Sequence, residues 1–216
     1  MTDQSAPKSG APSSSTAGRA SVPQSRSLAR GIRALLGDVR HLPDRLTHAR
    51  RRAEVRAHLA GRHLDSALFI CHGNICRSPY AAALFERDIR SRQRARVAIA
   101  SAGFIGPGRQ SPQLALATAA RNGIDMSAHR SALITQASLD ATDLAVVMDP
   151  AQEHALRTRF RISKSKILVL GDLDPQPIRR RTIRDPWGCD ESVYEASYAR
   201  IERCIRELVT ILTSAK

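Results

Sequence analysis

The 216-residue sequence has few aromatic residues and no long apolar run. Phenylalanine, tryptophan and tyrosine together make up 4% of the chain, which argues against nucleic-acid binding by base stacking. No apolar stretch approaches the roughly 20 residues that a membrane-spanning helix needs, and no signal-peptide core follows the N-terminus. We therefore expect a cytoplasmic protein that binds no nucleic acid.

Cysteines are also few: Cys71, Cys76, Cys189 and Cys204. Their spacing is unlike that of a secreted disulfide framework, which favours a reducing compartment. A structural zinc site usually takes two closely spaced pairs, and only Cys71 and Cys76 form one. We expect neither a metal nor another cofactor.

Acidic residues are scarce relative to basic ones. The chain has 34 lysines and arginines against 20 acidic residues, a net charge of +14, and residues 1–64 alone contribute +8. Residues 1–26 are rich in Ser, Ala, Pro and Gly, which predicts a disordered tail. Residues 27–64 read as a basic helical extension: apolar residues from Leu28 to Leu42 have helical spacing, Pro43 interrupts, and a second helical piece covers about 44–60.

The role of this extension stays open at the level of sequence. It could be a solvated helical segment that packs weakly or not at all. It could instead be an amphipathic helix that contacts an anionic membrane or an acidic partner. The acid-poor, Ser- and Arg-rich composition of residues 13–36 is also that of a transit segment.

Residues 65–216 show a different pattern, in which strands alternate with helices. We predict strands over 67–71, 97–102, 144–148 and 166–170, and helices over 79–92, 112–122, from about 150, and over 192–213. This alternation predicts an α/β fold of three layers, with a four-stranded parallel sheet between helices. Ligands of such sheets bind at the carboxyl ends of strands, and Cys71 ends the first predicted strand.

The segment from Cys71 to Pro79, with the sequence CHGNICRSP, carries the strongest chemical signal. A loop between a strand and a helix directs backbone N–H groups and the helix dipole at one point, which makes a phosphate-binding loop. Arg77 can bind two phosphate oxygens at once. Gly73 lets the backbone approach an anion, Asn74 suits a left-handed position, and Ser78 can cap the helix or donate to a thiolate at Cys71.

This string resembles the signature of the low-molecular-weight protein tyrosine phosphatase family. The resemblance extends over roughly residues 65–213. It includes Ser101-Ala102-Gly103 after the second strand, Gly123-Ile124-Asp125 with His129-Arg130, and Asp185-Pro186-Trp187 before the last helix. Trp187 departs from the tyrosine or phenylalanine more usual there, which bears on the choice of substrate.

The resemblance implies a role for each matching residue. Cys71 would attack phosphorus and form a phosphocysteine, and Asp185 would act as general acid and then base. Arg77 and the loop from His72 through Gly73, Asn74, Ile75 and Cys76 to Ser78 would bind the phosphoryl oxygens. Asn74, Ser78, Ser101 and His129 would support the loop, and Trp187 would wall the slot for the ring. Cys76 would form a reversible protective disulfide with Cys71.

The implied function is hydrolysis of phosphotyrosine in a protein, with a bacterial tyrosine kinase as a candidate partner. A thioredoxin-coupled arsenate reductase on the same fold would need relay cysteines, and none lies between Cys76 and Cys189. A phosphoarginine phosphatase tends to carry threonine where this chain has Ile75, and an apolar side chain better fits a flat aromatic leaving group. A non-catalytic phosphate-binding protein is the third alternative.

Overall fold

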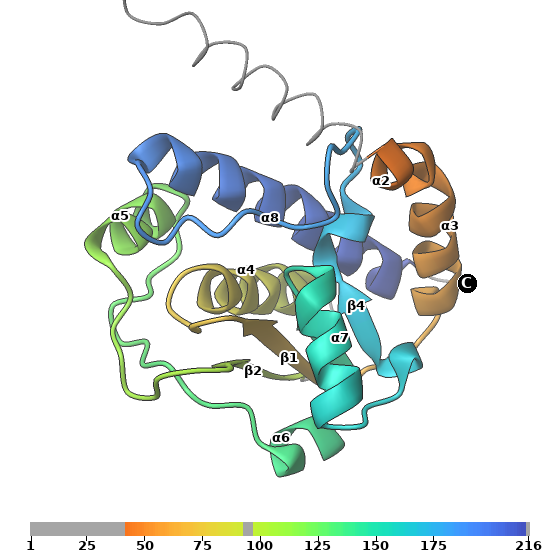
Figure 1. The fold of residues 1–216 in the computed structure, drawn as a ribbon, viewed down its shortest axis with the longest axis horizontal. Helices are drawn as coiled ribbons and strands as arrows, with labels where there is room; N and C mark the ends of the chain where they lie inside the picture. The colour runs from red at the N-terminus through yellow and green to blue at the C-terminus, as the bar shows by residue number, and fades with distance from the viewer. Residues whose placement is uncertain (1–41, 93–96, 215–216) are drawn as a thin grey trace, which may run out of the picture. The chain divides into compact units, whose positions relative to one another are not determined.

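The computed structural model describes residues 42–92 and 97–214. Its four strands form one parallel sheet in the order β2-β1-β3-β4. They are β1 (Ser66–Cys71), β2 (Ala98–Gly103), β3 (Leu144–Val147) and β4 (Ile167–Val169). The helices are α2 (Leu42–Leu46), α3 (His48–Leu59), α4 (Arg77–Arg92), α5 (Gln113–Arg121), α6 (Gln136–Asp140), α7 (Pro150–Arg159) and α8 (Glu191–Thr213), with 3-10 turns η1 (Lys164–Lys166) and η2 (Leu170–Leu173). Figure 1 shows their arrangement.

Helices cover both faces of the sheet. Along β1, Phe69 and Cys71 pack into a large apolar cluster with α4 and α8, whereas Leu68 and Ile70 pack into a second cluster with Leu139 of α6 and Leu156 of α7. Side chains of a strand alternate between faces, so each face has its own core. The three-layer α/β fold with four parallel strands is thus confirmed, and Figure 1 shows α7 on the side of the sheet away from α4 and α8.

Helix ends follow local signals in the sequence. The Asp149 carboxylate accepts the N–H of Gln152 at 2.8 Å and caps α7, with Pro150 in the first turn, a position that tolerates proline because its N–H would have no partner. The predicted strands and helices of residues 65–216 are present with small shifts at their ends. The short helix α6 and the two 3-10 turns were not predicted.

The extension is folded against the domain where the structure describes it. Leu59 is 1% exposed and belongs to the main core, and the buried His48 donates from Nε2 to the backbone oxygen of Asp174 at 2.9 Å. Arg52 and Arg56 of α3 pair with Glu207 of α8. The expectation of weak packing or none is therefore wrong for residues 48–64, because their basic side chains meet acidic partners and their apolar ones join the core.

Two further details concern the N-terminal part. Pro43 lies in the first turn of α2, and the break between α2 and α3 is at Thr47. The predicted disordered tail and the helix over 28–42 lie outside the described residues, except for Leu42. Within residues 42–92 and 97–214, no helix is long and apolar enough to span a membrane.

Candidate active site

The loop between β1 and α4 surrounds the sulfur of Cys71. Asn74 has φ 51°, the left-handed conformation that we predicted for it, and this directs its backbone N–H to Cys71 Sγ at 3.2 Å. The Ser78 hydroxyl donates to the same sulfur at 3.1 Å. Cys71 is 3% exposed, so two donors and the N-terminus of α4 face a sulfur largely removed from bulk water.

Asn74 connects the loop to three other segments. Its side-chain nitrogen donates to the hydroxyl oxygens of Ser78 and Ser101, each at 2.9 Å, and its side-chain oxygen accepts the N–H of Ala132 at 2.8 Å. Its backbone oxygen accepts from Nε2 of His129 at 2.8 Å. Since a carbonyl oxygen can only accept, this Nε2 carries the hydrogen.

Gly103 permits the close approach of β2 to the loop. A Cβ atom at this position would lie 2.8 Å from the backbone nitrogen of Asn74 and 2.9 Å from the backbone oxygen of His72. The next residue, Phe104, donates its N–H to that same His72 oxygen at 2.8 Å. The absence of a side chain at Gly103 is therefore part of the loop's construction.

Arg77 is a buried cation in the first turn of α4. Its side chain is 3% exposed; it donates to the backbone oxygen of Ile183 at 3.0 Å and pairs with the Asp185 carboxylate. Within the described structure its Nε is buried without a hydrogen-bond partner, and the backbone N–H groups of Gly73, Ile75 and Cys76 donate to no backbone oxygen. Buried unpaired donors are costly, and an oxyanion bound in the loop would satisfy them.

A cleft of about 140 Å³ opens above the loop. Its walls include Cys71, the loop residues His72, Gly73, Ile75 and Cys76, the carboxylate-bearing Asp185, and Ile105, Arg109 and Trp187. Trp187 is 66% exposed, so it stands at the rim, and Ile75 and Ile105 add apolar surface. The cleft combines an anion-binding floor with an apolar rim suited to a flat ring.

Arg109 is a site residue that the sequence analysis missed. Its guanidinium donates to the backbone oxygens of Gly73 at 2.8 Å, Gly106 at 2.9 Å and Ile105 at 3.0 Å. It thereby joins the phosphate-binding loop to the loop after β2. One signal could have indicated it. Arg109 is a basic residue in the Gly- and Pro-rich turn that follows the second strand, at the edge of the sheet where ligands bind.

Cys76 lies behind the loop, against α8. Burial raises the pKa of its thiol to about 12, its sulfur is 3.8 Å from the Tyr194 hydroxyl, and Tyr198 donates its hydroxyl to the Cys76 backbone oxygen at 3.1 Å. The ring of Tyr198 stacks on Tyr80 of α4 with centroids 3.9 Å apart. These aromatic side chains hold the back of the loop against the core.

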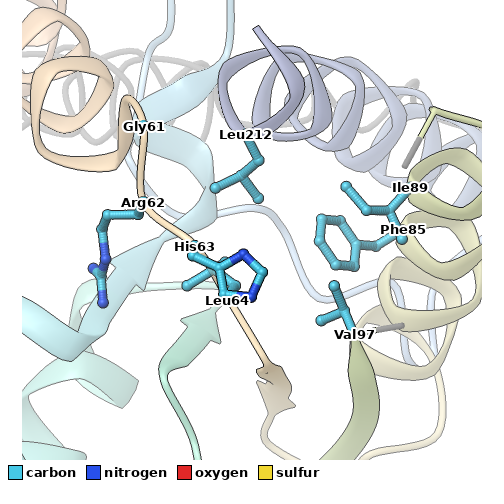
Figure 2. A pocket seen from close by; sticks show the side chains of 8 residues that line it. All are labelled: Gly61, Arg62, His63, Leu64, Phe85, Ile89, Val97 and Leu212. Atoms are coloured by element: carbon cyan, nitrogen blue, oxygen red, sulfur yellow. The ribbon is translucent and has the colours of Figure 1, made fainter. Parts of the chain in front are cut away.

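Other parts of the described structure offer less chemistry. A cavity of about 160 Å³ lies at the amino ends of β1 and β2, between the segment Gly61–Leu64, Phe85 and Ile89 of α4 and Leu212 of α8 (Figure 2). It is at the opposite end of the sheet from Cys71. Residues 42–92 and 97–214 contain no group of three or more His, Cys, Asp or Glu side chains that could hold a metal ion.

The site thus consists of a cysteine at the end of a parallel strand, a buried arginine, and a loop whose N–H groups at Gly73, Ile75 and Cys76 donate to no backbone oxygen, a set of donors suited to an oxyanion. The profile of the low molecular weight phosphotyrosine protein phosphatases matches residues 66–216, and the chain belongs to this family. The human low molecular weight phosphotyrosine protein phosphatase is 32% identical over 154 residues, covering 68% of this chain and 96% of the human one.

Two solved structures show the same fold. The tyrosine phosphatase Wzb from Escherichia coli K30, in complex with sulphate, has a TM-score of 0.59 at 26% identity and covers 68% of this chain and 97% of its own. The YwlE arginine phosphatase from Geobacillus stearothermophilus has a TM-score of 0.58 at 28% identity, with coverages of 67% and 90%. The family profile begins at residue 66, so it does not cover α2 and α3.

Proposed function

We propose that this protein-tyrosine-phosphatase hydrolyses phosphotyrosine through a phosphocysteine at Cys71. The observation that carries the proposal is a cleft lined by the Cys71 sulfur, by loop residues whose N–H groups donate to no backbone oxygen, and by Asp185, whose carboxylate pairs with the buried Arg77. Family membership supports the reaction class, a hydrolase acting on phosphate esters.

In the first step, Cys71 Sγ attacks phosphorus as the bond from phosphorus to the tyrosine oxygen breaks. The N–H groups of the loop and Arg77 bind the non-bridging oxygens, where charge is held in the transition state. Asp185, which must first leave Arg77 and take up a proton from solvent, gives that proton to the leaving phenolate, a contribution of typically 10²–10⁴-fold. In the second step Asp185 takes a proton from water, which attacks phosphorus, and the S–P bond breaks to release phosphate and the thiolate.

The ion pair between Arg77 and Asp185 gives substrate binding a second consequence. In the structure this carboxylate pairs with one end of the guanidinium. A bound phosphoryl group would compete for the same N–H groups and repel the carboxylate. We infer that substrate displaces Asp185 from Arg77 and so releases it toward the leaving oxygen.

Asn74, Ser78, Ser101 and His129 position the loop in this proposal, and Ile75 and Trp187 bound the ring of the substrate. The apolar Ile75 favours phosphotyrosine over phosphoarginine, whose guanidine would seek hydrogen bonds. The physiological substrate is then a tyrosine-phosphorylated protein, and a bacterial tyrosine kinase is the specific candidate for this substrate.

A reversible disulfide between Cys71 and Cys76 belongs to the same proposal. A peroxide would convert the Cys71 thiolate to a sulfenic acid, and the Cys76 thiol would displace water from it to form the disulfide. All four cysteines are free in the structure, consistent with a reducing, cytoplasmic setting.

The test compares wild type, Cys71→Ser and Asp185→Asn on one peptide carrying phosphotyrosine and on the same peptide carrying phosphoarginine. We expect wild-type turnover of phosphotyrosine, no turnover by Cys71→Ser, and a loss of roughly 10²–10⁴ in kcat for Asp185→Asn. Rapid quenching followed by mass spectrometry should place the phospho-adduct on Cys71. Full activity of Cys71→Ser would refute the mechanism. Faster hydrolysis of the phosphoarginine peptide would make phosphoarginine, and not phosphotyrosine, the substrate. A chelator should leave the rate unchanged.

A further inference from the structure

A basic groove adjoins the catalytic cleft. It has a volume of about 750 Å³ and shares Asp185 with the cleft, so the two are contiguous at the proposed general acid. Among the residues that the structure describes, Asp185 is the one acidic residue that lines it. Five arginines line the groove: Arg45, Arg179, Arg180, Arg184 and Arg200.

Three segments bring these arginines together. Arg45 comes from α2, Arg200 from α8, and the others from the segment between η2 and α8, which passes beside α2 in Figure 1. The backbone N–H of Arg181 in that segment donates to the Asp44 carboxylate of α2 at 3.3 Å. The N-terminal extension, which the family profile does not cover, thus supplies one wall of the groove.

The arginines of the groove differ in what they contact. Arg200 is structural: it donates to the carboxylate of Asp174 at 3.0 Å and to the backbone oxygens of Thr182 and Arg180 at 2.9 and 2.8 Å. Arg45, Arg180 and Arg184 are exposed and form no ion pair within the described residues. They are therefore available to an anionic partner.

Two acidic side chains in the first turns of α8 pair with an arginine that does not line the groove. Glu191 and Glu195 both pair with Arg121 of α5, at 2.6 and 3.2 Å. Asp185 is held by Arg77. The groove therefore keeps an excess of positive charge beside a site that takes a phosphate ester.

We propose that this groove binds acidic residues that flank the phosphotyrosine in the protein substrate. The inference rests on the proposed function, since it concerns what lies beside the ester bound in the cleft. Arginine matches carboxylate geometry with paired N–H donors, and a concave surface of one charge concentrates the opposite charge and speeds association. Aspartate and glutamate next to the phosphotyrosine would thus lie against Arg45, Arg180 and Arg184.

The experiment measures kcat/KM of the full chain on three peptides that share one phosphotyrosine and differ only in flanking residues: acidic, neutral amide or basic. We expect the acidic peptide to exceed the neutral one about tenfold at low salt, because several exposed charge pairs each contribute modestly. This preference should shrink as salt rises from about 0.05 to 0.5 M. The basic peptide should be the poorest substrate.

Two double variants distinguish an effect of the groove on substrate preference from an effect of the protein's net charge. Arg45→Gln with Arg180→Gln should lower the ratio of acidic to neutral kcat/KM about three- to tenfold. The control, Arg157→Gln with Arg159→Gln, removes two exposed arginines that form no ion pair among the described residues. They belong to α7, which covers the face of the sheet opposite α8. The control should leave the ratio unchanged.

Four outcomes would overturn the proposal. Equal kcat/KM for acidic and neutral peptides would remove it while leaving the phosphatase assignment intact. An equal loss of preference in both double variants would assign the effect to net charge. Loss of binding to anionic phospholipid vesicles in the Arg45 and Arg180 variant, with an unchanged peptide ratio, would make the groove a lipid contact. If no phosphotyrosine peptide is hydrolysed, the proposed function fails and the inference fails with it.

Discussion

Replacement of Asn74 by alanine tests whether this residue holds the phosphate-binding loop. The substitution removes three side-chain hydrogen bonds, to Ser78, Ser101 and Ala132. It also places alanine at φ 51°, a conformation that asparagine tolerates better than alanine. The side chain is 0% exposed, so water does not readily replace the lost partners.

The expected cost follows from these contacts. Each hydrogen bond contributes about 1 kcal/mol net, and alanine pays roughly 1 kcal/mol for the left-handed conformation. The two serine hydroxyls can rotate to other acceptors and recover part of this. We expect Asn74→Ala to lower the free energy of unfolding by about 3 kcal/mol, within the 5–15 kcal/mol typical of a domain, so that the variant still folds.

The matched variant is Asn74→Gly. It loses the same hydrogen bonds but adopts a positive φ without steric cost, so it should be about 1 kcal/mol more stable than Asn74→Ala. Urea unfolding at constant m-value measures both differences. Both variants should lose at least about tenfold in kcat/KM on a phosphotyrosine peptide, since a misplaced loop misaligns the sulfur and its donors.

The reasoning has two points of failure. If Asn74→Ala stays within about 1 kcal/mol of wild type, its hydrogen bonds do not hold the loop. If the glycine variant is the less stable of the two, the left-handed backbone is not what limits this position.

Three other perturbations test separate parts of the structure. Gly103→Ala should lower the free energy of unfolding by about 2–3 kcal/mol and reduce kcat/KM, because the new Cβ meets backbone atoms at 2.8 and 2.9 Å. The control is Gly108→Ala, where φ is 78° and nothing lies within 4 Å of the new Cβ, so that only backbone strain is added. An equal effect of the two substitutions would contradict the steric argument. Leu59→Ala should lower stability by about 3 kcal/mol if α3 is part of the core, whereas Leu46→Ala on α2, which is 74% exposed, should change it by less than about 0.5 kcal/mol. Hydrogen bonds from the Ser66 hydroxyl and then the Asp65 N–H lower the pKa of Asp143, so the stability that this carboxylate contributes is present near neutral pH and is lost as pH falls through its lowered pKa. The stability difference between wild type and Asp143→Asn, measured by urea unfolding, should therefore shrink in acid, and a difference independent of pH would contradict the shift.

Local pattern was enough to predict the sheet and the loop that follows β1. The apolar run that ends at Cys71 predicts a buried strand whatever lies around it, and the Gly73 and Asn74 that follow predict a turn into a helix. Because parallel strands present their carboxyl ends at one edge, the position of Cys71 also indicated where the site would be. The role of Asp185, which is far along the chain from Cys71, was predicted from the resemblance to the family and not from any local pattern.

Tertiary structure alone decided which distant groups meet. The sequence of α3 is a run of arginines that reads equally well as a solvated face, and only the positions of Glu207 and the core around Leu59 made it part of the domain. The contacts of Arg109 with the loop and of Asp185 with Arg77 likewise join residues 36 and 108 positions apart. Propensity and periodicity act over a few residues, whereas these contacts depend on how whole elements pack, and the chain's excess of arginine becomes a groove only once three segments fold together.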